Sequence, residues 1–202
     1  MMGRNHVVAN VGTMGVVMAA GAVLSGYSGK GCQYIQDGLN VIKQGFLAGY
    51  DSIGKVPGIA LIIGLFIFGT LLPDIDSPNS ILGRHVKVPG PHRTWTHTFW
   101  ALAAISLFRI LHVSFAWMAL GYFLHLFYDS FSRAGVCWFW PIEKYRRYGN
   151  GAMVKRGHKL KIYRAGQPSE YVCTAVIATL GALCWAYLIY IYLRPFVLSF
   201  GF

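Results

Sequence analysis

Seven residues of the types that bind metal ions lie in four separate stretches of the chain, each at the end of an apolar run. They are His6, Asp74, Asp76, His92, His97, His125 and Asp129. The whole chain has only seven acidic residues and seven histidines, so the set holds a large share of both. Carboxylate oxygens and imidazole nitrogens are ligands of zinc and manganese in proteins. The set therefore predicts a divalent metal centre on helix ends, with zinc expected, manganese as the alternative, and one or two ions.

Two carboxylates end the second apolar run, in the sequence LPDIDSP. Prolines on both sides of Asp74 and Asp76 restrict the local backbone. Carboxylates two residues apart in an extended chain point to opposite sides, so both need not bind the same ion. Both are candidate ligands, but one of them can instead orient a histidine or a water molecule. Asp76 is also the candidate for the catalytic base or water-orienting residue.

Two further motifs carry the histidines. In HRTWTH, His92 and His97 precede an apolar run, and Arg93 between them is placed to hold an anionic substrate group. In HLFYD, His125 and Asp129 are four residues apart and share one helix face. The alternatives are interfacial histidines in the first motif and a buried packing hydrogen bond in the second. Ionisable groups in apolar helices are costly and usually functional, which favours metal binding.

The composition indicates a single-domain, all-α integral membrane protein over residues 1–202. Hydrophobic residues make up 55% of the chain, charged residues only 12%, and the mean hydropathy is +0.46. A soluble domain usually carries about 25% charged residues. The four cysteines form no CxxC pair, so neither a zinc ribbon nor a disulfide framework is indicated.

Five apolar runs are predicted to be transmembrane helices, because each has about the length that crosses a bilayer. They are Val7–Ser25, Val56–Leu72, Trp95–Leu111, Val113–Phe131 and Tyr171–Leu193. The third and fourth have an alternative, a tight helical hairpin that stops short of the far surface. Apolar residues at helical spacing in Gln33–Lys55 predict a further amphipathic helix that lies on the membrane.

Threading five alternating spans through a bilayer places all seven candidate ligands on one side. Most lysines and arginines fall on the same side, and the positive-inside rule makes that side cytoplasmic. The expected protein is multi-pass, with its N-terminus and metal centre in the cytoplasm. A cleavable signal peptide is the alternative for the first run, and it would remove His6 and leave four spans.

The net charge of +11 is concentrated partly in the basic segment 144–164, where tyrosines alternate with lysines and arginines. A nucleic-acid groove is one interpretation of this pattern. Binding of anionic lipid headgroups is favoured, at about 1 kcal/mol per basic residue near the membrane surface. Membrane lipids are therefore the expected partners, and nucleic acid is not.

Several motifs together carry a resemblance to a known family. They are NHVVANVG, LPDIDSPNSILGR, HRTWTHT, GYFLHLFYDSFSRAGVCWFWP and RAGQPSEY. In this order, over most of residues 5–171, they resemble the YdjM-type inner-membrane metal-dependent hydrolases, although Asn5 stands where the family usually has Gly. That family is more distantly similar to zinc-dependent phospholipase C and related single-strand nucleases.

The resemblance implies hydrolysis in a bacterial inner membrane, with His6, Asp74, His92 or His97, His125 and Asp129 as metal ligands. The expected function is hydrolysis of a phosphoester or other ester, lipid-borne esters included. Arg93 and Arg84 are the candidates for holding the anionic part of the substrate. The alternative is a non-catalytic, metal-stabilised component of a larger assembly or homo-oligomer, which docks through the basic segment. An open coordination position would distinguish the catalytic from the structural site.

Overall fold

Helices make up nearly all of the regular structure. The computed structural model describes residues 3–24, 55–86, 88, 92–142, 146–147, 153–154 and 160–199. Its helices are α1 (Gly3–Leu24), α3 (Lys55–Leu71), α4 (Phe99–Leu107), α5 (Phe115–Phe131) and α6 (Pro168–Ser199). Short 3-10 helices are η1 (Leu72–Asp76), η2 (Trp95–His97) and η3 (Phe108–Ile110), and two-residue strands β1 (Arg146–Arg147) and β2 (Met153–Val154) pair antiparallel. The predicted all-α class is thus confirmed, while the predicted interfacial helix lies almost wholly outside the described residues.

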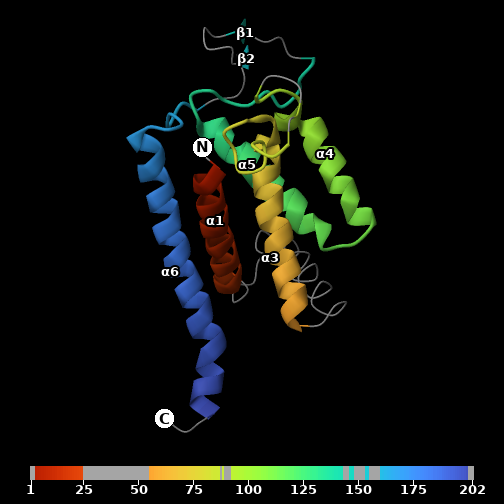
Figure 1. The fold of residues 1–202 in the computed structure, drawn as a ribbon. Coiled ribbons are helices and arrows are strands. Elements are labelled where there is room, and N and C mark those ends of the chain that lie inside the picture. The colour runs from red at the N-terminus through yellow and green to blue at the C-terminus, as the bar shows by residue number, and fades with distance from the viewer. Residues whose placement is uncertain are drawn as a thin grey trace.

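Close backbone contacts hold the long helices in two pairs, α1 against α6 and α3 against α5 (Figure 1). A Cβ atom on Gly181 would lie 2.2 Å from the Cα of Gly12, and one on Gly121 would lie 2.3 Å from the carbonyl oxygen of Phe66. Only glycine permits such approaches, a common device between helices in membranes. Side chains from α1, α3 and α5 then form one apolar cluster: Met14, Ile62, Phe66, Trp117 and Leu124.

Two described segments are long and apolar enough to cross a membrane, Arg4–Val23 and Pro168–Ile191. Helices α3 and α5 have 17 residues each, which is about 25 Å at 1.5 Å per residue and less than the ~30 Å of a bilayer core. The apolar segment of α4 with η3 ends at Ile110. The prediction of five full spans is therefore not confirmed, and the short α4 agrees better with the hairpin alternative.

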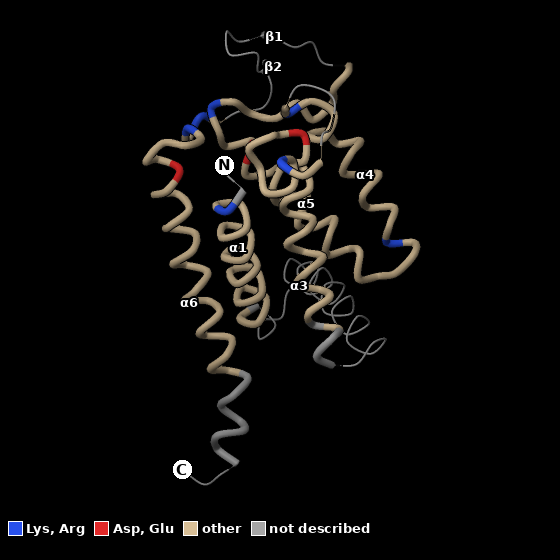
Figure 2. Tube along the Cα trace, viewed as in Figure 1, with Lys and Arg blue, Asp and Glu red and all other residues tan. Residues whose placement is uncertain are grey.

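The membrane helices and the charged residues are segregated. Helix α6 exposes apolar side chains along its length, Val172, Val176 and Leu183 among them, as a lipid-facing helix does. Figure 2 shows most of the described charged positions at the end of the bundle near the N-terminus, with one basic position beyond the far end of α4, while the described lengths of α1 and α6 that lead away from the N-terminal end lack them. The candidate ligands therefore lie at the polar end of the helix bundle.

Candidate metal centre

The predicted ligands meet in one buried cluster, although they come from four elements. His6 is on α1, Asp74 on η1, His97 on η2, and both His125 and Asp129 are on α5. Three histidines and Asp129 have no exposed surface, and Asp74 is only 6% exposed. His92, in the loop before η2, is the accessible member, with 35% of its side chain exposed.

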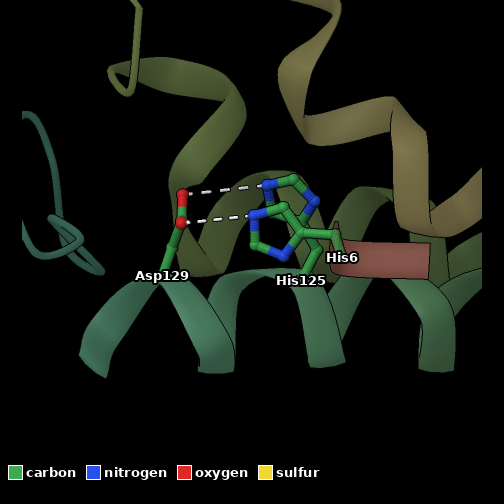
Figure 3. Close-up of side chains that lie close together, drawn as sticks. All are labelled: His6, His125 and Asp129. Atoms are coloured by element: carbon green, nitrogen blue, oxygen red, sulfur yellow. Dashed lines mark ion pairs between the residues drawn. The ribbon is translucent and has the colours of Figure 1, made fainter. Parts of the chain in front are cut away.

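The first group of ligands joins α1 to α5 (Figure 3). The rings of His6 and His125 stack with centroids 3.7 Å apart and planes 17° from parallel. Both rings direct Nε2 at Asp129: the His6 atom lies 3.3 Å from Oδ1 and the His125 atom 3.7 Å from Oδ2. His125 and Asp129, which are four residues apart on α5, thus present an imidazole and a carboxylate to the same point.

The second group consists of Asp74, His92 and His97. Asp74 Oδ1 lies 3.6 Å from His97 Nε2 and 3.9 Å from His92 Nε2. Cross-contacts join the groups, because His97 Nε2 lies 3.4 Å from Asp129 Oδ2 and His125 Nε2 lies 3.4 Å from Asp74 Oδ1. The two carboxylates therefore stand between the two sets of imidazoles.

Hydrogen bonds at Nδ1 fix how three of the rings face the cluster. His125 Nδ1–H donates to the carbonyl oxygen of Thr70 at 2.7 Å, and a carbonyl can only accept. His97 Nδ1–H donates to Thr96 Oγ1 at 3.0 Å, because the Thr96 hydroxyl proton already goes to Asp76. His92 Nδ1–H donates to Asp76 Oδ1 at 2.7 Å. In the neutral form, which is the form that binds metal, each of these rings would therefore present the lone pair of Nε2 to the cluster, the arrangement typical of metal-binding histidines.

The cluster fits a metal ion by its donor atoms and its spacing. The Nε2 atoms of His6, His97 and His125 are buried without a hydrogen-bond partner among the described residues. Leaving such atoms unsatisfied costs free energy, so a partner is expected. Two ligand atoms of one tetrahedral zinc lie about 3.3 Å apart, since each is 2.0–2.1 Å from the ion. Several of the nitrogen–oxygen distances in the cluster lie close to this spacing.

The electrostatic field in the cluster favours a positive charge. Burial alone lowers the pKa of His97, but its contacts with Asp129 and Asp74 raise that pKa to about 9. Burial raises the pKa of Asp74, yet the neighbouring His125 and His97 hold it well below its usual range. Two ionised carboxylates buried among imidazoles thus make a site whose charge suits a cation.

Comparison with known proteins identifies the family of the chain. The family described as YdjM inner membrane protein matches residues 42–197. The chain belongs to this family. The proteins named inner membrane protein YdjM in Escherichia coli (strain K12) and in Shigella flexneri are each 35% identical to it over 96 residues, covering 40% of the chain and 49% of each relative. The chain thus spans about half the length of these relatives, and no solved structure matches it.

In this YdjM family member, Asp76 lies beside the cluster and orients one of its histidines. Its carboxylate accepts hydrogen bonds from His92 Nδ1, from the backbone N–H of Arg93 at 3.0 Å and from the Thr96 hydroxyl at 2.7 Å. Burial raises the pKa of Asp76, and the hydrogen bond from His92 lowers it below its usual value. With these donors on both oxygens, the geometry favours an orienting role for Asp76 over a ligand or base.

Asp76→Asn is expected to lower the affinity for metal by about 10–100-fold, as is typical when the partner of a ligating histidine is lost. An amide can still accept one hydrogen bond, so the fold is retained, but His92 loses its anionic partner. Competition with a zinc chelator would measure the affinity. An unchanged affinity would show that His92 does not bind the metal or does not need Asp76 to orient it.

The two predicted substrate-binding arginines lie in different environments. Arg93 is buried, and its guanidinium donates to Asp129 Oδ1 at 2.9 Å and to Ser132 Oγ at 3.1 Å. Its φ of 66° lies in the left-handed region, which side chains other than glycine seldom adopt. Arg84 is exposed and its Nε donates to the carbonyl oxygen of Ile81. Arg93 therefore touches the centre, whereas no described contact links Arg84 to it.

Sequence patterns did not identify the residues that support the ligands. Thr70 and Thr96 contact candidate ligand histidines, but a threonine at a helix end has no distinctive spacing. Glu170 has no exposed surface and accepts from Asn5 Nδ2 at 2.7 Å and from the Gly166 N–H at 2.6 Å. This contact ties the start of α6 to the residue before His6. In the sequence, Glu170 belongs to the RAGQPSEY motif, whose only signal is the family resemblance.

Proposed function

We propose that the chain is a membrane-bound, metal-dependent hydrolase that acts on a phosphoester or other ester. The observation that carries this proposal is the meeting of three buried imidazole nitrogens, which have no hydrogen-bond partner among the described residues, with two carboxylates at one point. The two groups of ligands support two ions, with zinc expected and manganese as the alternative. Both metals accept nitrogen and oxygen ligands of this kind.

In this proposal each residue has a defined task. His6, His125 and Asp129 hold one ion, and Asp74, His92 and His97 hold the other. When bound, such ions lower the pKa of a coordinated water and polarise the scissile bond. In the hydrolysis the water oxygen bonds to phosphorus, the bond to the leaving alcohol breaks, and a water proton ends on the alcohol oxygen. Asp76 fixes the ring of His92, and the exposed edge of His92 marks the side from which substrate enters.

The alternative proposal, a structural metal site in a larger assembly, rests on burial. Most of the cluster has no exposed surface, and a closed site with all positions filled by protein is typical of structural metals. The partly exposed His92 and the presence of two candidate ligand groups favour catalysis instead. The test is turnover of phosphomonoester, phosphodiester and phospholipid substrates by the purified, metal-loaded protein. Full metal loading without turnover of any of them would support the structural site.

Arg93→Ala is expected to keep the metal and to lower hydrolysis by about 100-fold, the usual cost of removing a charged group that stabilises the transition state. The guanidinium provides no ligand atom, and it lies beside Asp129, where a developing anion on the substrate would need a cation. Arg93→Lys should restore activity only in part, because ammonium lacks the planar fork. Loss of metal together with activity in both variants would instead show that Arg93 only holds Asp129 in place.

The family membership supports placement in the bacterial inner membrane, and we propose that the metal centre faces the cytoplasm. The support for this orientation is the excess of lysines and arginines in the segments that the five-span prediction places on the same side of the membrane as the candidate ligands. Single cysteines at Asn150 and Phe202, in a chain whose own cysteines are replaced, should react from the inside and the outside, respectively. Labelling of position 150 by an impermeant reagent added to intact cells would contradict the orientation. The basic segment 144–164 is proposed to bind anionic headgroups on the same side.

A further inference from the structure

A cavity of about 560 Å³ lies next to the metal centre and is lined almost wholly by apolar side chains. Its walls come from η1, η2, α4 and α5 and include Leu72, Ile75, Trp95, Trp100, Ala104 and Ile105. Its volume lies within the range of about 300–1,000 Å³ that is usual for small-molecule sites. Trp95 and Trp100 are also strongly exposed, at 43% and 51%, as aromatic residues at a membrane interface are.

The cavity and the metal centre share structural elements. Thr96 lines the cavity, and its hydroxyl donates to Asp76 at 2.7 Å and accepts from His97. Leu72 and Ile75 lie on η1 on either side of Asp74, so one short helix contributes to both. Tyr122 lines the cavity too and its hydroxyl donates to the carbonyl of Thr96. A single molecule can therefore place a polar group at the ligands and an apolar group in the cavity.

We propose that this cavity binds the hydrocarbon chain of an amphiphilic ester whose polar head is hydrolysed at the metal centre. The inference rests on the proposed hydrolase function and narrows its substrate to a lipid. An apolar lining gives a water-soluble phosphoester no partner for its polar groups, whereas it stabilises an alkyl chain by removing it from water. The adjoining carboxylates and imidazoles suit the polar head of such a ligand and not its alkyl chain.

Two matched substitutions on α4 distinguish the effect of filling the cavity from the effect of adding bulk elsewhere on the helix. Ala104 lines the cavity and is exposed, so Ala104→Phe adds a side chain into the cavity without displacing the core. Ala103 is its neighbour on α4 and does not line the cavity, so Ala103→Phe adds the same bulk elsewhere. Neither residue belongs to a candidate ligand group, and both variants should bind metal as the wild type does.

The activity experiment uses 4-nitrophenyl alkyl phosphates whose alkyl chain is lengthened stepwise, kept below the concentration at which they form micelles. For the wild type, kcat/KM should rise by about fourfold for each methylene that enters the cavity, until the chain fills it. Ala104→Phe should move this optimum to shorter chains and leave the methyl ester unaffected, while Ala103→Phe should follow the wild type. The inference would be overturned if kcat/KM of the wild type did not depend on chain length, or if Ala104→Phe and Ala103→Phe had the same dependence.

A binding experiment keeps the inference testable without turnover. Trp95, Trp100 and Trp140 line the cavity, so an alkyl phosphonate with a bromine at the end of its chain should quench tryptophan fluorescence in a saturable way. The apparent Kd should be about tenfold weaker in Ala104→Phe, the usual scale of an overpacking penalty, and unchanged in Ala103→Phe. If the quenching is saturable and weakened by Ala104→Phe in a protein that hydrolyses none of the substrates, the cavity binds alkyl chains but the proposed hydrolase function is wrong. Equal quenching in both variants would overturn the cavity's role even in an active enzyme.

Discussion

Asp129→Asn is expected to remove metal from both ligand groups and to lower hydrolysis by at least about 100-fold. The oxygens of Asp129 face His6 and His125 of its own group and also His97 of the other group, so its loss affects both. The amide keeps the shape of the carboxylate but lacks its charge, and its nitrogen offers hydrogens where the imidazoles present lone pairs. Elemental analysis of the purified variant would measure the remaining metal.

The matched control for this variant is Ser130→Ala. Ser130 is the next residue on α5, and its hydroxyl donates to the carbonyl of Leu126 within the same helix. This variant should keep full metal content and membrane insertion. Retention of full metal content by Asp129→Asn would show that Asp129 pairs with Arg93 alone and is not a ligand.

The two ligand groups should be separable by single substitutions of histidine. His6→Ala removes a ligand from the group with His125 and Asp129, and His92→Ala removes one from the group with Asp74 and His97. Each variant should bind one ion per chain where the wild type binds two, since a lost ligand costs at least about tenfold in affinity. Both variants should lose hydrolysis by about 100-fold if two ions act together.

Quantitative metal titration of both variants, each compared with His85→Ala, would test this division. His85 is exposed in the turn after η1 and belongs to neither ligand group. If the wild type binds a single ion, and this ion is lost in His6→Ala but kept in His92→Ala, the whole centre lies on α1 and α5. The converse pattern would place it on η1 and η2.

Much of the helical arrangement could be predicted from the sequence. Long apolar runs indicated α1, α3 and α5 to within four residues of their observed ends, whereas α6 ends six residues beyond the predicted Leu193. The length of α4 could not be predicted, because the apolar run continues through η3 into the next turn without a breaker. Hydropathy alone does not distinguish a short buried hairpin from two full spans.

The sequence predicted that the seven candidate residues lie close together, but it did not predict which of them face the cluster and which orient a neighbouring side chain. Alternation of spans placed the residues at one end, and the i, i+4 spacing aligned His125 with Asp129. Whether Asp74 or Asp76 faces the cluster depends on the turn of η1, and there the donors Thr96 and His92 take both oxygens of Asp76. The cavity beside the centre could not be predicted either, because it is formed by residues from elements far apart in the sequence.

X-ray absorption at the zinc edge of the zinc-loaded protein tests the central claim most directly. We predict a shell of nitrogen and oxygen atoms at about 2.0–2.2 Å with the outer scattering of imidazole, and no sulfur shell at about 2.3 Å. The same spectrum should lose imidazole scattering in His125→Ala, whose ring is fixed by Thr70 and directed at Asp74. A protein that binds no stoichiometric metal, or a zinc bound by thiolate in both proteins, would contradict a metal centre built from these histidines and aspartates.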